Sequence, residues 1–194
     1  MQMTDPTPQT GSPNSVQAES RQIEPQLTPQ VEPWMSGTHA DVPAVGRAVL
    51  HALELAQLDL KHWTTGLSGA EVHAQPLNLP SIAFHLRHIA RSIDRLLTYA
   101  EGKQLFTDQL AALKAEEDGR EPLAVLMAEV EASFSDAAAR VRVLAHADLE
   151  IARGVGRKQL PTTVGGALIH VADHTQRHTG QAVTTAKVLL ALRR

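Results

Sequence analysis

The chain contains no cysteine. This absence excludes disulfide bonds, thiolate metal ligands and a cysteine nucleophile, and it is typical of a protein kept in a reducing compartment. Aromatic residues make up only 3% of the sequence, which leaves little with which to stack nucleic-acid bases. The formal net charge of −3 gives no basic footprint for nucleic acid or for an anionic membrane. We therefore expect neither nucleic acid nor a membrane among the partners.

Long apolar runs are also missing. No stretch of 18 apolar residues exists, so the sequence predicts no transmembrane helix. The N-terminal segment MQMTDPTPQTGSPNSVQ lacks both the basic region and the apolar core of a signal peptide. A cytoplasmic location is the expectation that follows.

The length of 194 residues suits one compact domain and a tail. Residues 1–21 are rich in Pro, Gln, Ser and Thr, and we predict that they are disordered because they hold too little apolar surface to offset the entropy of ordering. Residues 22–37 place apolar residues every three or four positions between prolines, which forbid a regular helix. This segment is predicted to be an extended arm docked through Trp34, with a longer disordered tail as the alternative. Residues 38–194 are predicted to form the folded domain.

Apolar residues recur at intervals of three and four in four segments of this domain, which is the period of an amphipathic helix. The first helix is predicted to begin near Thr38 or Asp41, and prolines are expected in the first turns of the second and third. The connection at 101–120 is long enough for a crossover and holds one short helix, whereas 146–161 is predicted to be irregular. No run has the alternation of a strand, so the predicted fold class is all-α, a four-helix bundle. The predicted helices span residues 38–63, 80–100, 121–145 and 162–194.

Three histidines stand at a strict spacing of four in the last helical segment, namely His170, His174 and His178. Residues four apart lie one turn above each other on the same face of an α-helix, about 6 Å apart. His174 and His178 fall within or beside the apolar seam, and His170 lies at its edge. Two interpretations are open at this stage: hydrogen-bonded core histidines, or metal ligands presented by one helix. His51 and His62 lie off the seam of the first helix and are predicted to be surface residues.

A third ligand has to come from a facing helix, and the second helical segment offers His85 and His88. The apolar seam of that segment passes closer to His85, so periodicity alone favours His85.

Resemblance to a known family favours the other histidine. The segments HLRHIARSIDRLLTYAEG and LPTTVGGALIHVADHTQRHTGQ resemble the DinB/YfiT-like family of metalloenzymes, and the resemblance covers essentially residues 38–192. That family carries a histidine in an H-[LI]-A context on its second helix and His-x3-His on its fourth. Here HIA begins at His88, and HTQRH runs from His174 to His178. The following TGQ differs from the common Arg-Gly-Gln only at Thr179, outside the ligands.

The resemblance implies a metal ion bound by His88, His174 and His178. It leaves His85, His170 and Gln181 as residues that support the ligands or line the pocket. Three imidazoles without a carboxylate suit Zn²⁺ or Ni²⁺ better than Mg²⁺ or Ca²⁺. With unperturbed pKa values near 6.5, these ligands are expected to release the ion below about pH 6.

Three protein ligands leave a position open for water or substrate, as catalytic sites do. The ion can lower the pKa of bound water to about 7 or hold a thiol as thiolate. The catalytic residues are unknown, because no general base is evident, and the expected nucleophile is the metal-bound water or thiolate.

Members of the family include transferases that use low-molecular-weight thiols. We therefore expect a metal-dependent transferase that activates a small thiol, or a hydrolase using the same centre, acting on a small-molecule substrate. The alternative is a non-catalytic metal-binding or stress-response bundle that the ion braces; a plain bundle with core histidines is a third interpretation. A homodimer is left open.

Overall fold

The computed structural model describes residues 31–116 and 119–193. The tail predicted at 1–21 and the first part of the predicted arm, 22–30, lie outside the described residues. The described chain is helical apart from one short hairpin, which confirms the all-α prediction. Its elements are η1 (Pro33–Met35), α1 (Ala44–Thr64), α2 (Gly69–Val72), η2 (Pro76–Asn78), α3 (Ile82–Ala100), α4 (Thr107–Lys114), α5 (Leu123–Leu144), β1 (Ala152–Val155), β2 (Leu160–Thr163) and α6 (Val164–Leu192).

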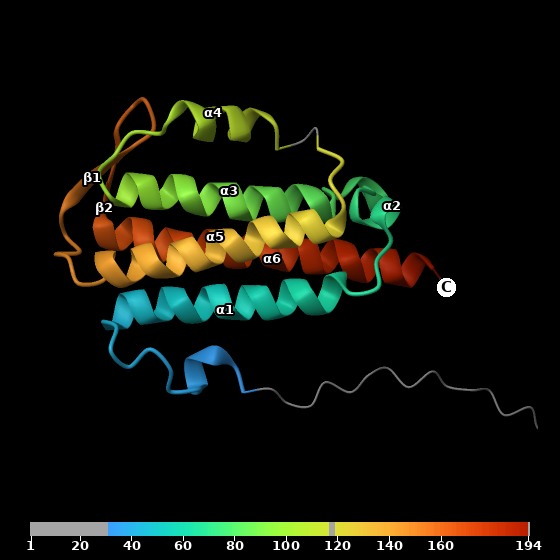
Figure 1. Ribbon diagram of the computed structural model, residues 1–194, viewed down its shortest axis with the longest axis horizontal. Coiled ribbons are helices and arrows are strands. Elements are labelled where there is room, and N and C mark those ends of the chain that lie inside the picture. Colours follow the sequence, from blue (N-terminus) through green and yellow to red (C-terminus); the bar gives the residue numbers. More distant parts are fainter. Residues whose placement is uncertain (1–30, 117–118, 194) are drawn as a thin grey trace, which may run out of the picture. The chain divides into compact units, whose positions relative to one another are not determined.

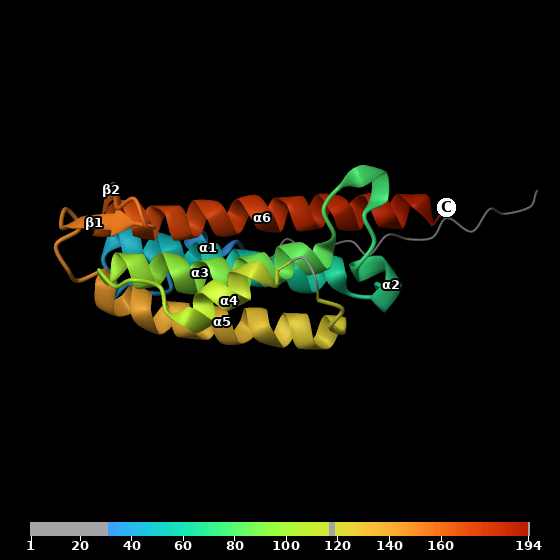
Figure 2. The ribbon, with the colours of Figure 1, turned by 90° about the horizontal axis from the view of Figure 1, so that it is seen from above.

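The four long helices α1, α3, α5 and α6 lie side by side and form the predicted bundle (Figures 1 and 2). Helices α1 and α6 run in one direction, and α3 and α5 run in the other. Helix α6 packs against α1 and α3, while α5 packs against α3 and α1. Because α3 and α5 are parallel, the connection between them has to return along the bundle. Helix α4 lies in this connection, which agrees with the crossover and the short helix expected for 101–120.

Capping residues set where the helices begin. The Ser81 hydroxyl accepts a hydrogen bond from the Phe84 amide at 3.1 Å and caps α3. The Thr163 hydroxyl caps α6 in the same way, through the Gly166 amide at 3.1 Å. Pro43 and Pro122 occupy the cap positions of α1 and α5 in extended conformations, which proline adopts readily, so both helices begin one residue after the proline.

The start of α1 differs from the prediction. His39 has a left-handed backbone with φ of 56°, which excludes a helix from Thr38, and the extended backbone of Pro43 excludes one from Asp41. The helix therefore begins only at Ala44.

The link at 146–161 also differs, because most of it belongs to an antiparallel hairpin. Strands β1 and β2 pair with the register Ala152↔Thr163 and Val155↔Leu160. Each strand has only four residues, which is too short for an alternating pattern to be recognised in the sequence. The Arg153 guanidinium ties the hairpin to the end of α3 by donating to the Ala100 carbonyl at 2.6 Å.

The apolar seams of the four helices meet in one core. Its largest fully buried apolar side chains include Leu60, Ile82, Leu86, Ile89, Ile93, Leu97, Leu126 and Leu168. Gly46 marks a close approach between α1 and the end of α5, since a Cβ there would overlap the Cβ of Ala145. Within the described residues, no helix combines the length and the apolar character needed to cross a membrane.

The segment before α1 covers the flank of that helix, and two predictions fail there. Trp34 is not a buried anchor: its side chain is 64% exposed and its indole N–H donates to Glu32 at 2.7 Å. Pro33 is the buried residue of η1, which packs against α1. His51 is buried rather than on the surface, because this segment covers it and the Thr38 hydroxyl lies 3.1 Å from its Nε2 atom.

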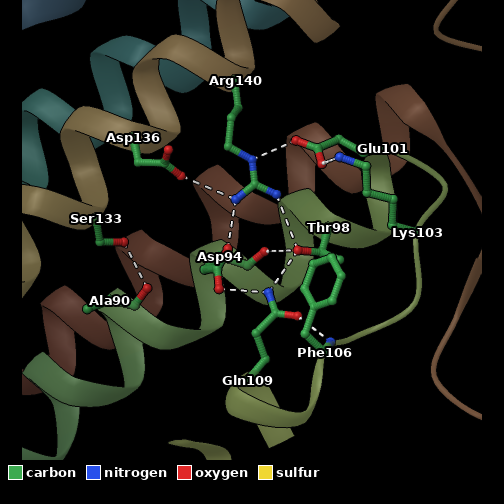
Figure 3. Close-up of polar contacts among 10 residues, drawn as sticks. All are labelled: Ala90, Asp94, Thr98, Glu101, Lys103, Phe106, Gln109, Ser133, Asp136 and Arg140. Atoms are coloured by element: carbon green, nitrogen blue, oxygen red, sulfur yellow. Dashed lines mark hydrogen bonds and ion pairs between the residues drawn. The ribbon is translucent and has the colours of Figure 1, made fainter.

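A polar network joins α3, α4 and α5 (Figure 3). The Arg140 guanidinium on α5 donates to Glu101 at 2.6 Å and to Asp94 at 2.8 Å, both supplied by α3 or its end. Gln109 on α4 donates to Asp94 at 2.7 Å and to the Thr98 hydroxyl at 2.9 Å. The network therefore fixes the crossover connection against the two parallel helices.

Candidate metal centre

Helices α3 and α6 pack antiparallel and bring three histidines together. His88 lies on α3, and His174 and His178 lie one turn apart on α6. Each offers a nitrogen atom within 4.8 Å of those of the other two. The Nε2 atoms of His88 and His174 are 3.3 Å apart, and the His178 ring centroid lies 4.3 Å from that of His88. The three residues that the family resemblance implied as ligands thus share one small space.

A buried carboxylate supports His88 from the side away from this space. Glu116 follows α4, is 4% exposed, and has its Oε2 atom 2.7 Å from His88 Nδ1. Its other oxygen accepts from Arg95 at 2.7 Å. Burial raises the pKa of Glu116, but the hydrogen bonds and charges of His88 and Arg95 outweigh this effect and lower the pKa overall. An ionised carboxylate only accepts, so His88 Nδ1 carries a hydrogen, and in the neutral ring Nε2 then has the lone pair.

A serine places the hydrogen of His174 in the same way. The Ser92 hydroxyl donates to the Ile89 carbonyl at 3.1 Å and lies 3.3 Å from His174 Nδ1. When the hydroxyl hydrogen goes to the Ile89 carbonyl, the hydroxyl accepts from Nδ1–H, and Nε2 of His174 then has the lone pair.

When both rings are neutral and carry their hydrogens at Nδ1, two nitrogen lone pairs face each other at 3.3 Å between His88 and His174. They repel unless a proton or a cation lies between them. Two nitrogens bonded to one tetrahedral ion at about 2.0–2.1 Å lie about 3.3–3.4 Å apart, which matches the observed separation. The donor set thus fits a divalent metal ion.

His178 completes the pattern. Its Nδ1 atom lies 3.2 Å from Nδ1 of His85, so this imidazole is also held at Nδ1 by a neighbour on α3. Each of the three rings is therefore contacted at Nδ1, which leaves Nε2 as the atom able to bind a common ligand. Supporting contacts of this kind orient metal-binding histidines and fix their tautomers.

Burial keeps His174 and His178 neutral. Burial, and then the positive charge of neighbouring histidines, lowers the pKa of both His174 and His178 to about 4. Both rings are thus neutral at pH 7, which is the form that binds a metal. The expectation of unperturbed pKa values near 6.5 is wrong for these two residues.

The other residues singled out in the sequence take different positions. His85 is 1% exposed, as its place on the apolar seam predicted, whereas His88 lies on the flank that faces the histidines of α6. His85 is therefore the more buried of the two histidines, whereas His88 is the one grouped with His174 and His178. His170 is exposed and its Nδ1 atom lies 3.4 Å from Asp173. Gln181 is exposed and lines a small pocket together with His85.

Sequence reasoning missed Glu116, Ser92 and Arg95. Ser92 stands four residues after His88, so helical spacing would have placed it on the same face. Glu116 lies in a connection without periodicity, and nothing in the pattern marks it.

Two cavities flank the histidines. The larger one, of about 450 Å³, is lined by His73, Asn78, Phe84 and Arg120 among others. Phe84 stacks on His88 with the ring planes 16° apart, so this cavity adjoins the site. The smaller one, of about 240 Å³, lies between Pro80 and the Arg177–Thr185 stretch of α6.

A second group of potential ligands contains His39, His51 and Glu54. The Arg142 guanidinium lies 2.7 Å from His39 Nδ1 and can only donate, so Nε2 of His39 carries a hydrogen. That hydrogen is directed to Glu54 at 2.6 Å. The nitrogen that would bind a metal is thus occupied, and the hydrogen bonds favour a role in holding the N-terminal segment on α1.

The fold and the site together define a four-helix-bundle protein with a group of histidines able to hold a metal ion. The sequence model of the DinB superfamily matches residues 52–182, and the chain belongs to this superfamily. The match includes all three histidines as well as Glu116. No curated protein matches the chain.

Proposed function

We propose that Zn²⁺ or Ni²⁺ binds to His88, His174 and His178, and that the centre activates a small thiol for transfer to a small-molecule substrate or water for hydrolysis. The observation that carries the proposal is the pair of Nε2 atoms held 3.3 Å apart by partners at Nδ1. Three protein donors leave a position of a four-coordinate ion for an external molecule.

Residues around the histidines prepare the site. Glu116 keeps the proton of His88 at Nδ1, and Arg95 holds that carboxylate in place. Ser92 keeps the proton of His174 at Nδ1. Phe84 covers one face of His88 and restricts water there. When bound, the ion supplies Lewis acidity, which lowers the pKa of a thiol or a water molecule.

The apolar core favours a catalytic role of the metal over a structural one. The apolar side chains of all four long helices are buried against each other without help from the histidines. A structural metal usually contributes much of the folding energy, whereas a catalytic ion can be removed with the fold intact. Chelation should therefore abolish activity while the helical circular dichroism signal and the thermal midpoint change little. Loss of the helical signal on chelation would support the bracing alternative instead.

Metal content tests the ligand assignment. We expect elemental analysis to find about one ion per chain in the wild type and almost none in His174→Ala or His88→Ala. His170→Ala is the matched control, because it removes an exposed histidine one turn away on the same helix, and it should keep the metal. Equal metal in His174→Ala and wild type would refute the site. Loss of metal in His85→Ala but not in His88→Ala would reassign the ligand on α3.

The reaction class can be tested with the same protein. The zinc-loaded chain would be assayed with electrophilic and ester substrates, with and without an added low-molecular-weight thiol. A product that forms only with the thiol, and not in His174→Ala, supports the transferase; a product that forms equally without it supports the hydrolase. No product with either, from protein that carries its metal, would contradict a catalytic role toward these substrates.

A further inference from the structure

The smaller cavity beside the histidines is lined by a buried histidine and an arginine. It is lined by His85 from α3, by Pro80, and by Arg177, Gly180, Gln181 and neighbouring threonines of α6. None of the described side chains that line it is acidic. His85 is 1% exposed, so this part of the wall is buried rather than a surface groove.

His85 has one nitrogen in use and one unpaired. Its Nδ1 atom faces Nδ1 of His178 at 3.2 Å. If His178 keeps Nε2 for a ligand, its Nδ1–H donates to His85, and the hydrogen of His85 is then on Nε2. Nε2 is buried and has no hydrogen-bond partner among residues 31–116 and 119–193. A buried N–H without an acceptor is unfavourable, so an acceptor at this wall would be favourable.

Arg177 supplies positive charge to the same cavity. Its guanidinium pairs with Asp173, one turn earlier on α6, at 3.0 Å, and its side chain is 55% exposed. Exposed pairs of this kind are weak, so the guanidinium can turn toward a ligand at little cost. A neutral N–H and a guanidinium on one wall are the groups that bind a carboxylate.

We propose that this cavity is a carboxylate subsite beside the metal centre, with His85 Nε2–H and Arg177 as donors and His178 as the link between the two. The carboxylate would lie on the side of the His85 ring away from His178. Its binding does not require a metal, so it can be measured in metal-free protein. Two parts of the proposal rest on the proposed function: the hydrogen at His85 Nε2, because it follows from His178 keeping Nε2 for the ion, and the assignment of the carboxylate to a substrate.

Gly180 allows the cavity to be filled without disturbing the helix. It lies on the wall, and a Cβ built there meets nothing within 4 Å. Gly180→Leu should therefore occupy the space, whereas Gly180→Ala adds only a methyl group and is its control. Arg177→Gln removes the positive charge. Lys187→Gln is its control, because it makes the same change on the same helix, where Lys187 lies over the Trp63 ring.

The binding experiment titrates metal-free protein with acetate at pH 7 and constant ionic strength, followed by amide NMR shifts. Acetamide is the neutral probe of the same shape. We expect saturable shifts at Gly180 and Gln181 with acetate and none with acetamide. Gly180→Leu and Arg177→Gln should each weaken acetate binding roughly tenfold or more, while both controls bind like wild type. Thermal midpoints establish that each variant is folded.

Three results would overturn the subsite. Acetate produces no saturable shift at these residues, Gly180→Leu binds acetate like wild type, or Arg177→Gln and Lys187→Gln weaken binding equally. None of these depends on whether the protein binds a metal, so a failure of the proposed function remains distinguishable.

A free carboxylate and the carboxylate of a substrate would bind this cavity through the same contacts. A second titration distinguishes these two sources. Zinc-loaded protein would be titrated with glutathione and with S-methylglutathione, which carry the same carboxylates but differ in a free thiol. Tighter binding of glutathione that is lost in Gly180→Leu assigns the carboxylate to a thiol substrate. Equal binding of both, weakened by Gly180→Leu, assigns the pocket to the carboxylate alone. Binding of both compounds that Gly180→Leu leaves unchanged would contradict a subsite for either.

Discussion

Glu116→Gln tests whether the carboxylate behind His88 prepares that histidine for a metal. The substitution keeps the shape of the side chain but replaces one acceptor oxygen by an NH2 group. Arg95 can only donate, so the remaining oxygen is expected to face Arg95, which now contacts Oε1 at 2.7 Å. The NH2 group then faces His88 Nδ1, which has to accept. The hydrogen of His88 consequently moves to Nε2, the atom that faces His174.

The size of the effect follows from these contacts. To bind a metal through Nε2 in the variant, His88 has to return its hydrogen to Nδ1. That hydrogen then faces the NH2 group of the glutamine, which cannot accept it. Loss of such a supporting group typically lowers metal affinity about 10–100-fold. The buried pair with Arg95 also weakens, which should destabilise the fold by about 1–3 kcal/mol, since Glu116 is 4% and Arg95 8% exposed.

The assay is a competition between the protein and a chelating zinc indicator, with urea unfolding of the metal-free protein alongside. Glu129→Gln is the matched control: Glu129 on α5 accepts from Arg91 of α3 at 2.8 Å, and within the described residues it makes no hydrogen bond to a histidine. We expect Glu129→Gln to bind zinc like wild type. If Glu116→Gln is less stable but binds zinc as tightly as wild type, Glu116 supports Arg95 alone, and the tautomer argument is wrong.

Two further predictions concern stability. Arg140→Ala should lower the free energy of unfolding by about 2 kcal/mol in urea denaturation, because it breaks the half-buried hydrogen bonds to Glu101 and Asp94. The control Lys103→Ala removes an exposed partner of the same Glu101 and should lower the free energy of unfolding only slightly. Equal losses in the two variants would contradict the role of the network. Metal-free protein should lose stability as the pH falls from about 6.5 toward 5. His85, His174 and His178 have folded pKa values of about 4, so the unfolded chain binds more protons in this range. A urea midpoint that stays constant over this range would contradict the lowered pKa values, and zinc should correspondingly be retained to a lower pH than free imidazoles would allow.

The long helices were predictable from the sequence because each carries a seam of apolar residues through several turns. The helix starts were less predictable, since Pro43 and Pro122 fit equally well inside the first turn or just before it. The hairpin at β1 and β2 was missed because four-residue strands are too short to show an alternating pattern. His51 was misplaced because burial of a helix flank depends on which segment covers it, and periodicity does not report that.

The candidate site was predictable in part for the same reason. The spacing of His174 and His178 is local, so one helix determines it. The choice between His85 and His88 depends on how α3 is rotated against α6, and here the seam favoured the buried residue while the flank faces the histidines. The resemblance to the family carried that information, and periodicity did not.

The topology of the bundle explains why a carboxylate stands behind His88. Helices α3 and α5 are parallel, so the chain between them has to pass back along the bundle instead of turning in a short loop. On this return it crosses the α3 residues that face outward from the core. Arg87 and Arg95 hold the segment there, the former through the Glu116 carbonyl at 2.8 Å and the latter through its carboxylate. An antiparallel hairpin between the same two helices would be too short to reach this position. The crossover thus provides His88 with a partner at Nδ1 that neither helix carries itself.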